Sequence, residues 1–245
     1  MNIQKYLERI GLAGMEPDGS AEQLNRLIAA HTESIAFENL DAWLYKKVPD
    51  LDTEALYRKI VENSRGGWCH ELNGLFCEFL KALGYKAFST GARLFINGQV
   101  SGMGHRCTIC EIEGMRYYVD VGYGSLFLMS AVPFDGSVTP YGFHVENEGK
   151  WYFVYKGDSK VIGFSDVPFE PQDFVIPNYY DATFPGLFFN QTLYSSKLEN
   201  GVRVEFKGDT LSVGSGAEKK VIFETSDVEE KKRILWERFG LKIPE

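Results

Sequence analysis

Residues 65–73, Arg-Gly-Gly-Trp-Cys-His-Glu-Leu-Asn, place a cysteine at the predicted start of an amphipathic helix. After Cys69, apolar residues recur at steps of three and four until Gly84 supplies a stop. These residues are Leu72, Leu75, Phe76, Phe79, Leu80 and Leu83. A thiol in the first turn of a helix lies near the positive end of the helix dipole, which favours the thiolate. Helix position therefore leaves two interpretations of Cys69: an activated nucleophile or a buried structural cysteine.

Composition and charge exclude several classes of function. At 245 residues, 44% of them hydrophobic, the chain is long enough to bury a full core. Its net charge of −8 argues against a general binder of nucleic acid or membrane surfaces. No apolar run reaches the roughly 18 residues of a membrane span, and the charged N-terminal segment is unlike a secretory signal. We therefore expect a cytoplasmic protein whose four cysteines stay reduced.

The chain divides into a helical part followed by a part rich in strands. Ser20 with Gln23 forms a capping-box pattern, and Asp52 or Thr53 is expected to cap a second helix. Beyond Gly84, strands are predicted at 85–96, 107–112, 115–121, 151–155, 160–164, 202–206, 210–213 and 220–224. Residues 165–190 are expected to form a long irregular crossover, and a last helix to start at Ser226. Helices first and mostly antiparallel strands afterwards indicate an α+β fold.

A nucleophilic cysteine needs a base, and His105 is the histidine that we expect to supply it. If Ile112 pairs with Met115 across the turn at Glu113-Gly114, Cys107 stands opposite Asp120. His105 and Asp120 then share a face as diagonal neighbours, within reach of a hydrogen bond. A one-residue bulge at the turn would instead separate them. A purely structural His–Asp pair is the alternative interpretation.

The remaining histidines and cysteines are expected to have structural roles. His31 is expected in the core or at a helix end, His70 points about 100° away from Cys69, and His144 lies in an aromatic loop without an obvious carboxylate partner. Cys107 and Cys110 have a metal-like spacing, but residues three apart in a strand point to opposite faces. Cys77 is expected in the core, and no metal site is predicted.

Four segments together resemble the arylamine N-acetyltransferase family. The run at residues 65–73 resembles its Arg-Gly-Gly-x-Cys-x-Glu-x-Asn signature. Residues 36–41, Ala-Phe-Glu-Asn-Leu-Asp, resemble a family segment that usually starts with Pro. Gly104-His105 and residues 119–124, Val-Asp-Val-Gly-Tyr-Gly, match the segments that carry its His and Asp, with Tyr123 in place of the more usual Phe.

The resemblance implies a fold and a division of the chain. The fold would be an α+β, papain-like cysteine-nucleophile fold: an N-terminal helical bundle at residues 1–84, a central antiparallel β-barrel at 85–190 and a small C-terminal α/β lid at 191–245. Cys69, His105 and Asp120 would form the catalytic triad. Acetyl-CoA would be the cosubstrate, with no tightly bound cofactor, and an arylamine, hydrazine or N-hydroxyarylamine would accept the acetyl group in a ping-pong cycle through a thioester.

The remaining roles follow from that chemistry. The backbone N–H of Cys69 is expected to stabilise the oxyanion, and Arg65 and Glu71 are expected to fix the loop by an ion pair. Phe37, Trp68 and Tyr123 are expected to bind the aryl acceptor, with core packing as the alternative. Gly122 and Gly124 would let the backbone approach CoA closely.

Three competing functions stay open on sequence alone. One is a related acyltransferase or amide synthase that uses another acyl-CoA. Another is a papain-like protease, although its usual cysteine context is absent. The third is a catalytically silent binding protein of the same fold. The physiological acceptor and the oligomeric state are not predicted.

Overall fold

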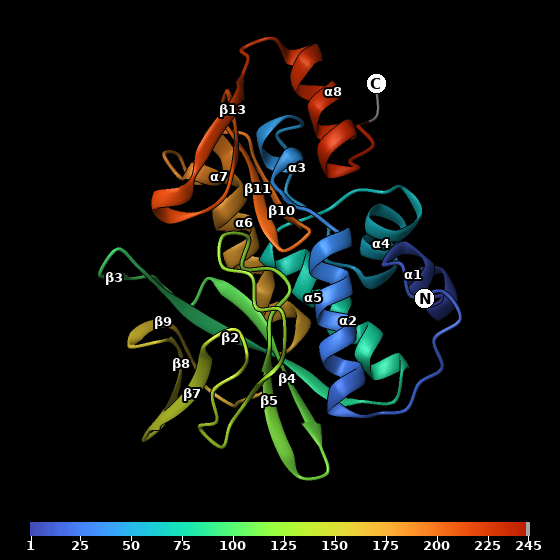
Figure 1. The fold of residues 1–245 in the computed structure, drawn as a ribbon, viewed down its shortest axis with the longest axis vertical. Helices are drawn as coiled ribbons and strands as arrows, with labels where there is room; N and C mark the ends of the chain where they lie inside the picture. The colour runs from blue at the N-terminus through green and yellow to red at the C-terminus, as the bar shows by residue number, and fades with distance from the viewer. Residues whose placement is uncertain (244–245) are drawn as a thin grey trace.

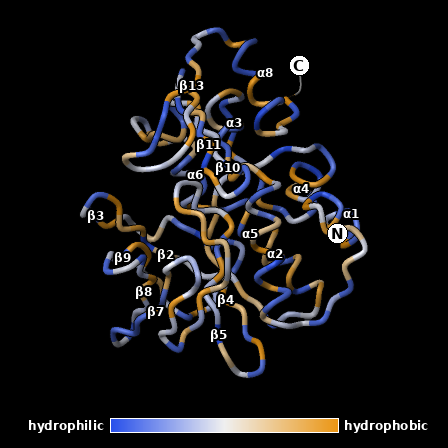
Figure 2. Tube along the Cα trace, in the orientation of Figure 1, coloured by the Kyte–Doolittle hydropathy of each residue, from blue (hydrophilic) through white to orange (hydrophobic). Residues whose placement is uncertain are grey.

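The first third of the chain forms the predicted helices in the computed structural model, which describes residues 1–243 (Figure 1). The helical elements are α1 (Ile3–Arg9), α2 (Ala21–Ser34), α3 (Leu40–Trp43), α4 (Thr53–Tyr57), the π-helical segment η1 (Arg58–Glu62) and α5 (Cys69–Ala82). Ser20 caps α2 by accepting a hydrogen bond from the backbone N–H of Gln23, and Asp52 caps α4. Figure 2 shows hydrophobic and hydrophilic residues alternating along α2, as expected of a helix that buries one face.

Helix α5 begins at Cys69 and is buried along most of its length. Leu72, Leu75, Phe76 and Phe79 are fully buried and pack in one apolar cluster with α1, α2 and α4. Each such side chain contributes about 1.5–3 kcal/mol relative to an exposed one. The chain leaves the helix at Gly84 with φ of 94°, a left-handed conformation that favours glycine. The core therefore fixes the helix that carries the predicted nucleophile.

The middle of the chain forms an antiparallel sheet that curls into a nearly closed barrel. Its strands are β2 (Lys86–Ile96), β3 (Gln99–Val100), β4 (His105–Ile112), β5 (Met115–Val119), β6 (Val132–Pro133), β7 (Phe143–Glu148), β8 (Trp151–Lys156) and β9 (Ser159–Phe164). The order is β6-β5-β4-β2-β9-β8-β7, with β3 paired to β2, and the two edge strands β6 and β7 contact each other. The barrel core includes Tyr118, Phe143 and Phe164.

The register of β4 and β5 agrees with the predicted register. Ile112 pairs with Met115 and Thr108 with Val119, so the turn at Glu113-Gly114 holds two residues and no bulge. Both turn residues have positive φ, as a tight hairpin of this kind requires. Asp120 follows the last paired residue of β5 and His105 begins β4.

The C-terminal part forms a second sheet with a helix against it. This sheet has the order β1-β10-β11-β12-β13, with α8 (Val228–Phe239) covering it (Figure 1). Its strands are β1 (Phe37–Glu38), β10 (Tyr194–Glu199), β11 (Val202–Lys207), β12 (Thr210–Val213) and β13 (Lys220–Glu224), with the short 3-10 turn η3 (Gly216–Glu218) before β13. Helix α8 is capped by Asp227 rather than by the predicted Ser226. The α+β class is confirmed. The division at residues 84 and 190 stays a prediction, and the sheet crosses it, because β1 of the first part pairs with β10 of the last.

The prediction of an irregular crossover at residues 165–190 was wrong. This stretch holds the 3-10 turn η2 (Pro171–Phe174), α6 (Val175–Thr183) and α7 (Phe188–Gln191). Pro171 and Pro177 lie in first turns, where a missing N–H removes no intrahelical bond. Asn178 anchors α6 because its side chain accepts a hydrogen bond from Trp68 Nε1 and donates one to the carbonyl of Pro49, both at 2.9 Å. Among residues 1–243, no helix is long and apolar enough to cross a membrane.

Candidate active site

Cys69 lies at the first position of α5 and opens onto a cleft of ≈ 640 Å³. The cleft is also lined by His105, Gly122 and Tyr123 from the barrel part of the chain. Trp68 precedes the helix in extended conformation, and the Glu71 carboxylate accepts a hydrogen bond from the Trp68 backbone N–H at 3.2 Å. The Cys69 sulfur is therefore at the positive end of the helix, as predicted, and is reachable from the cleft.

His105 and Asp120 meet beside this thiol. The Nε2–H of His105 donates to Oδ2 of Asp120 at 2.6 Å, and both side chains are almost fully buried. Burial alone would lower the pKa of His105. The adjacent Asp120 carboxylate raises it by more, and Cys69 raises it further, so the pKa lies at about 10 instead of 6.5. The Asp120 bond occupies Nε2, which leaves Nδ1 of the ring for the thiol.

Three further donors hold the Asp120 carboxylate. Oδ2 also accepts from the Tyr118 hydroxyl at 2.9 Å, while Oδ1 accepts from Asn73 Nδ2 at 2.8 Å and from the Gly122 backbone N–H at 2.9 Å. Burial raises the pKa of Asp120, but His105 and the hydrogen bonds from Asn73 and Gly122 outweigh it and hold the pKa below its ordinary value. The carboxylate therefore stays charged and fixed in orientation.

Asn73 is a site residue that was not predicted from the sequence. Besides Asp120, its Nδ2 donates to the carbonyl of Arg106 at 2.6 Å, and its Oδ1 accepts from the backbone N–H of Val121 at 2.8 Å. One side chain thus ties α5 to β4 and to the loop that carries Asp120. The available signal was its spacing, because a residue four positions after Cys69 lies on the same face of a helix.

The two glycines assigned to CoA are required by packing. A Cβ on Gly122 would lie 2.9 Å from the Cα of Cys69, and one on Gly124 would lie 2.8 Å from the Phe37 ring. Gly122 lines the cleft, whereas Gly124 lies beneath Phe37 and is not among the lining residues. Their contact with CoA stays a prediction.

Of the aromatic residues proposed for the acceptor, some line the cleft and one does not. Phe37 and Tyr123 line the cleft, together with Phe189 of α7. Trp68 is buried beside the cleft and is not a lining residue; its ring meets Phe189 edge to face. The structure therefore brings two of the three predicted acceptor contacts to the cleft.

Arg65 and Glu71 form ion pairs, but with different partners. Arg65 contacts Glu38 at 2.8 Å and Asp41 at 2.9 Å, and Lys59 contacts Asp41 at 2.7 Å and Glu71 at 2.6 Å. Glu38, Asp41 and Lys59 of this partly buried cluster were not predicted as members. The cluster fixes the loop before Cys69, as predicted for Arg65 and Glu71. The two side chains do not pair with each other, because Asp41 and Lys59 lie between them.

The other cysteines are buried away from the cleft. Cys107 packs in the barrel core and Cys110 in the helical core, which confirms that they point to opposite faces of β4. Burial raises the pKa of Cys110 to about 12 and that of Cys77 and Cys107 as well. Within the described residues, Cys69 is thus the cysteine that a substrate can reach.

Two histidine predictions are confirmed and one is wrong. His31 is buried and hydrogen-bonded to the Tyr6 hydroxyl at 2.9 Å, and burial lowers its pKa to about 3. His70 is buried, does not line the cleft with Cys69, and pairs with Asp181 at 3.4 Å. His144 lies in β7 rather than in a loop and contacts the carboxylate of Glu146 at 3.3 Å, because the two alternate residues share a strand face.

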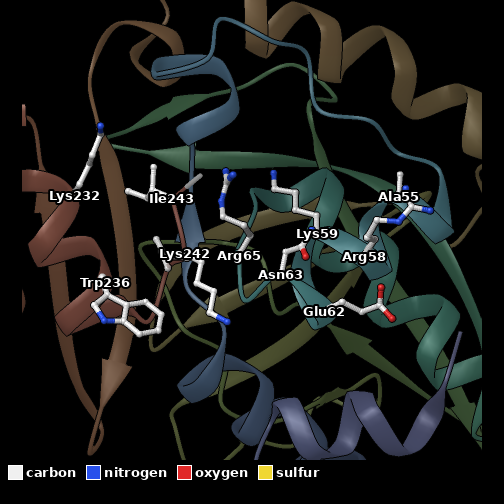
Figure 3. Close-up of a pocket in the computed structure, with 11 residues that line it drawn as sticks. Ala55, Arg58, Lys59, Glu62, Asn63, Arg65, Lys232, Trp236, Lys242 and Ile243 are labelled. Carbon is white, nitrogen blue, oxygen red and sulfur yellow. The ribbon is translucent and has the colours of Figure 1, made fainter. Parts of the chain in front are cut away.

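A larger cavity of ≈ 840 Å³ lies between η1 and α8, lined by Arg58, Lys59, Arg65, Lys242 and Trp236 among others (Figure 3). Figure 3 shows the charged ends of Lys59 and Arg65 extending the same way, while Arg58 and Lys242 point elsewhere, so the cations of this cavity do not converge on one point. Lys59 and Arg65 already pair with buried carboxylates. The residues that line this cavity include no cysteine or histidine, so the cleft at Cys69 is the candidate active site.

Comparisons with known proteins agree with this geometry. An N-acetyltransferase family model matches residues 20–245. An arylamine N-acetyltransferase of Mycolicibacterium smegmatis is 29% identical over 92% of this chain and 87% of its own length. A Salmonella typhimurium arylamine N-acetyltransferase / N-hydroxyarylamine O-acetyltransferase is 28% identical over 91% and 83%. The structure of Mycobacterium marinum arylamine N-acetyltransferase in complex with CoA superposes with a TM-score of 0.88 at 26% identity, covering 98% of this chain and 93% of that one. The chain belongs to the arylamine N-acetyltransferase family.

Proposed function

We propose that this enzyme transfers an acetyl group from acetyl-CoA to the nitrogen of an arylamine or hydrazine, with Cys69 as the carrier. The observation that supports it most is the 2.6 Å contact between His105 and Asp120 beside the one cysteine that reaches the cleft in the described chain. The cleft walls are largely apolar and aromatic, as a flat aryl acceptor requires.

In the first half-reaction, the sulfur of Cys69 attacks the acetyl carbonyl carbon. The C–S bond to CoA then breaks, and the imidazolium of His105 gives its proton to the departing CoA sulfur. The backbone N–H of Cys69, at the start of α5, is the proposed donor to the tetrahedral oxyanion. The products are free CoA and an acetyl thioester on Cys69.

In the second half-reaction, the acceptor nitrogen attacks the thioester and His105 takes its proton. Acylation removes the charge on sulfur that helps to raise the pKa of His105, so the imidazole is more readily neutral at this stage. The Cys69–acetyl bond then breaks and the thiolate returns. O-Acetylation of N-hydroxyarylamines uses the same steps with oxygen as the attacking atom.

The direct test combines an assay with mass spectrometry. Purified protein is mixed with acetyl-CoA alone and digested, and the mass of the peptide that contains Cys69 is measured. We expect it to gain the mass of one acetyl group and to lose it when an arylamine is added. Cys69→Ser should show neither change, and Cys77→Ser serves as the matched control. An acetyl group on another residue, or turnover without any acylated peptide, would contradict the proposal.

The same experiment also tests which acyl group Cys69 accepts. Presenting several acyl-CoAs in the same experiment identifies the acyl group that Cys69 accepts fastest, and we expect acetyl. A cytoplasmic location stays a prediction, which cell fractionation would test.

A further inference from the structure

The cleft at Cys69 contains one carboxylate that the proposed chemistry does not use. Asp181 of α6 lines the cleft together with Ile176, Tyr180 and Phe189, which are apolar or aromatic. Its side chain is 19% exposed, so water and ligands reach it. Among the described lining residues there is no lysine or arginine. A charged carboxylate in an otherwise apolar wall costs free energy unless it meets a counter-ion.

The protein supplies Asp181 with a weak partner. His70 Nε2 lies 3.4 Å from the Asp181 carboxylate, but both ring nitrogens of His70 lack a hydrogen-bond partner. His70 is fully buried, and burial lowers its pKa although Asp181 opposes this, so the ring is neutral at neutral pH. His70 therefore does not balance the charge of Asp181.

The other cations nearby do not contact Asp181 from within the cleft. The charge of His105 is balanced by Asp120. The Arg106 guanidinium donates to Ser89 and stacks over the ring of Phe174 at 4.3 Å, and it does not line the cleft. The wall of the cleft formed by α6 therefore presents one carboxylate, with no lysine or arginine among the described lining residues to pair with it.

We propose that Asp181 selects among acceptors by charge, so that the preferred substrates are arylamines bearing a cationic substituent and arylamines bearing a carboxylate are disfavoured. This inference rests on the proposed acetyl transfer. A charged substituent about 6 Å from the Asp181 carboxylate interacts with it measurably even at the dielectric constant of water. Reversing the sign of the substituent turns attraction into repulsion, so the cation and the anion differ in interaction energy by twice that amount. The expected preference is about tenfold or more in kcat/KM.

The test uses three para-substituted anilines of similar size. They carry a dimethylaminomethyl group (cation), an acetate group joined through its methylene (anion) or an isobutyl group (neutral). The methylene insulates the reacting nitrogen from the charged group. We expect the cation-to-anion ratio of kcat/KM to fall about tenfold or more in Asp181→Asn and to be kept in Asp181→Glu, which retains the charge.

Two controls distinguish the local charge of Asp181 from the net charge of the protein and from a loss of folding. Asp158→Asn removes the same charge from an exposed turn, and the ratio should stay at its wild-type value. An equal fall in Asp158→Asn would assign the effect to net charge and overturn the proposal, as would an unchanged ratio in Asp181→Asn. If Asp181→Asn does not fold, the wild-type ratio should still fall as salt rises, and a salt-independent ratio overturns the proposal. Failure of the wild type to acetylate even the neutral aniline would instead contradict the proposed function.

Discussion

Replacing Asp120 with Asn tests the electrostatic basis of the site. The substitution keeps the shape of the side chain but removes the charge 2.6 Å from His105 Nε2. The rise in the pKa of His105 from 6.5 to about 10 corresponds to an interaction on the order of 5 kcal/mol in favour of the charged ring. Without the carboxylate, burial, which is the largest influence and lowers the pKa, is opposed only by the smaller effect of Cys69, so the pKa of His105 should fall to about 6.5 or lower.

Titration of the ring by NMR measures this change directly. The His105 signal, identified by its absence from His105→Gln, should titrate near pH 10 in the wild type and below about pH 6.5 in Asp120→Asn. Acetyl transfer should fall with it, by about 10⁴-fold if the effect resembles that of the corresponding change in a serine triad. Asp158→Asn should leave the titration unchanged.

Stability supplies an independent readout with a definite sign. Because the pKa of His105 is raised in the folded state, its contribution is fully present below about pH 6.5 and is lost as pH rises through about 10. Asp120→Asn should therefore be less stable by about 3–5 kcal/mol at neutral pH, with the difference narrowing toward pH 10. A His105 ring that still titrates near pH 10 in the variant would refute the assignment of the shift to Asp120.

Three other substitutions probe the surrounding structure. Asn73→Ala removes the hydrogen bonds that join α5 to β4 and to Asp120, so urea unfolding should show a loss of about 2–4 kcal/mol, and a loss below about 1 would contradict a bridging role. Gly122→Ala forces a Cβ against the backbone of Cys69 and should cost about 1–3 kcal/mol in thermal unfolding while lowering the rate of Cys69 acetylation; a fully active variant would disprove the close contact. His31→Gln should reduce the loss of stability between pH 6.5 and 3, because His31 takes up a proton in that window in the unfolded chain and not in the folded one. A free energy of unfolding that depends on pH as steeply in the variant as in the wild type would count against this.

The parts of the site that rest on local rules could be predicted from the sequence. The turn at Glu113-Gly114 fixes the register of β4 and β5, and that register alone brings His105 to Asp120. Helical periodicity placed Cys69 at the first position of α5 in the same way. In both cases, neighbouring residues in the chain determine the geometry.

The parts that depend on distant residues could not be predicted. Helix α6 is held by Asn178, which contacts Trp68 and Pro49 more than 100 residues away. The prolines and aromatics of this segment are typical of a loop, so an irregular crossover was predicted there and Asp181 was not considered for the cleft. Asn73 and Lys59 likewise act through partners that only the folded chain brings near them.

Strand β1 makes the catalytic cleft dependent on the C-terminal sheet. Phe37 pairs with Ser196 of β10 on one side, and the Glu38 N–H donates to the carbonyl of Gly67 at 2.9 Å on the other. Local opening of that sheet would release a cleft wall and the approach to Cys69 together. Amide hydrogen exchange at Glu38 should therefore follow exchange in β10, and fluctuations of the C-terminal sheet would set how often the enzyme is competent to react.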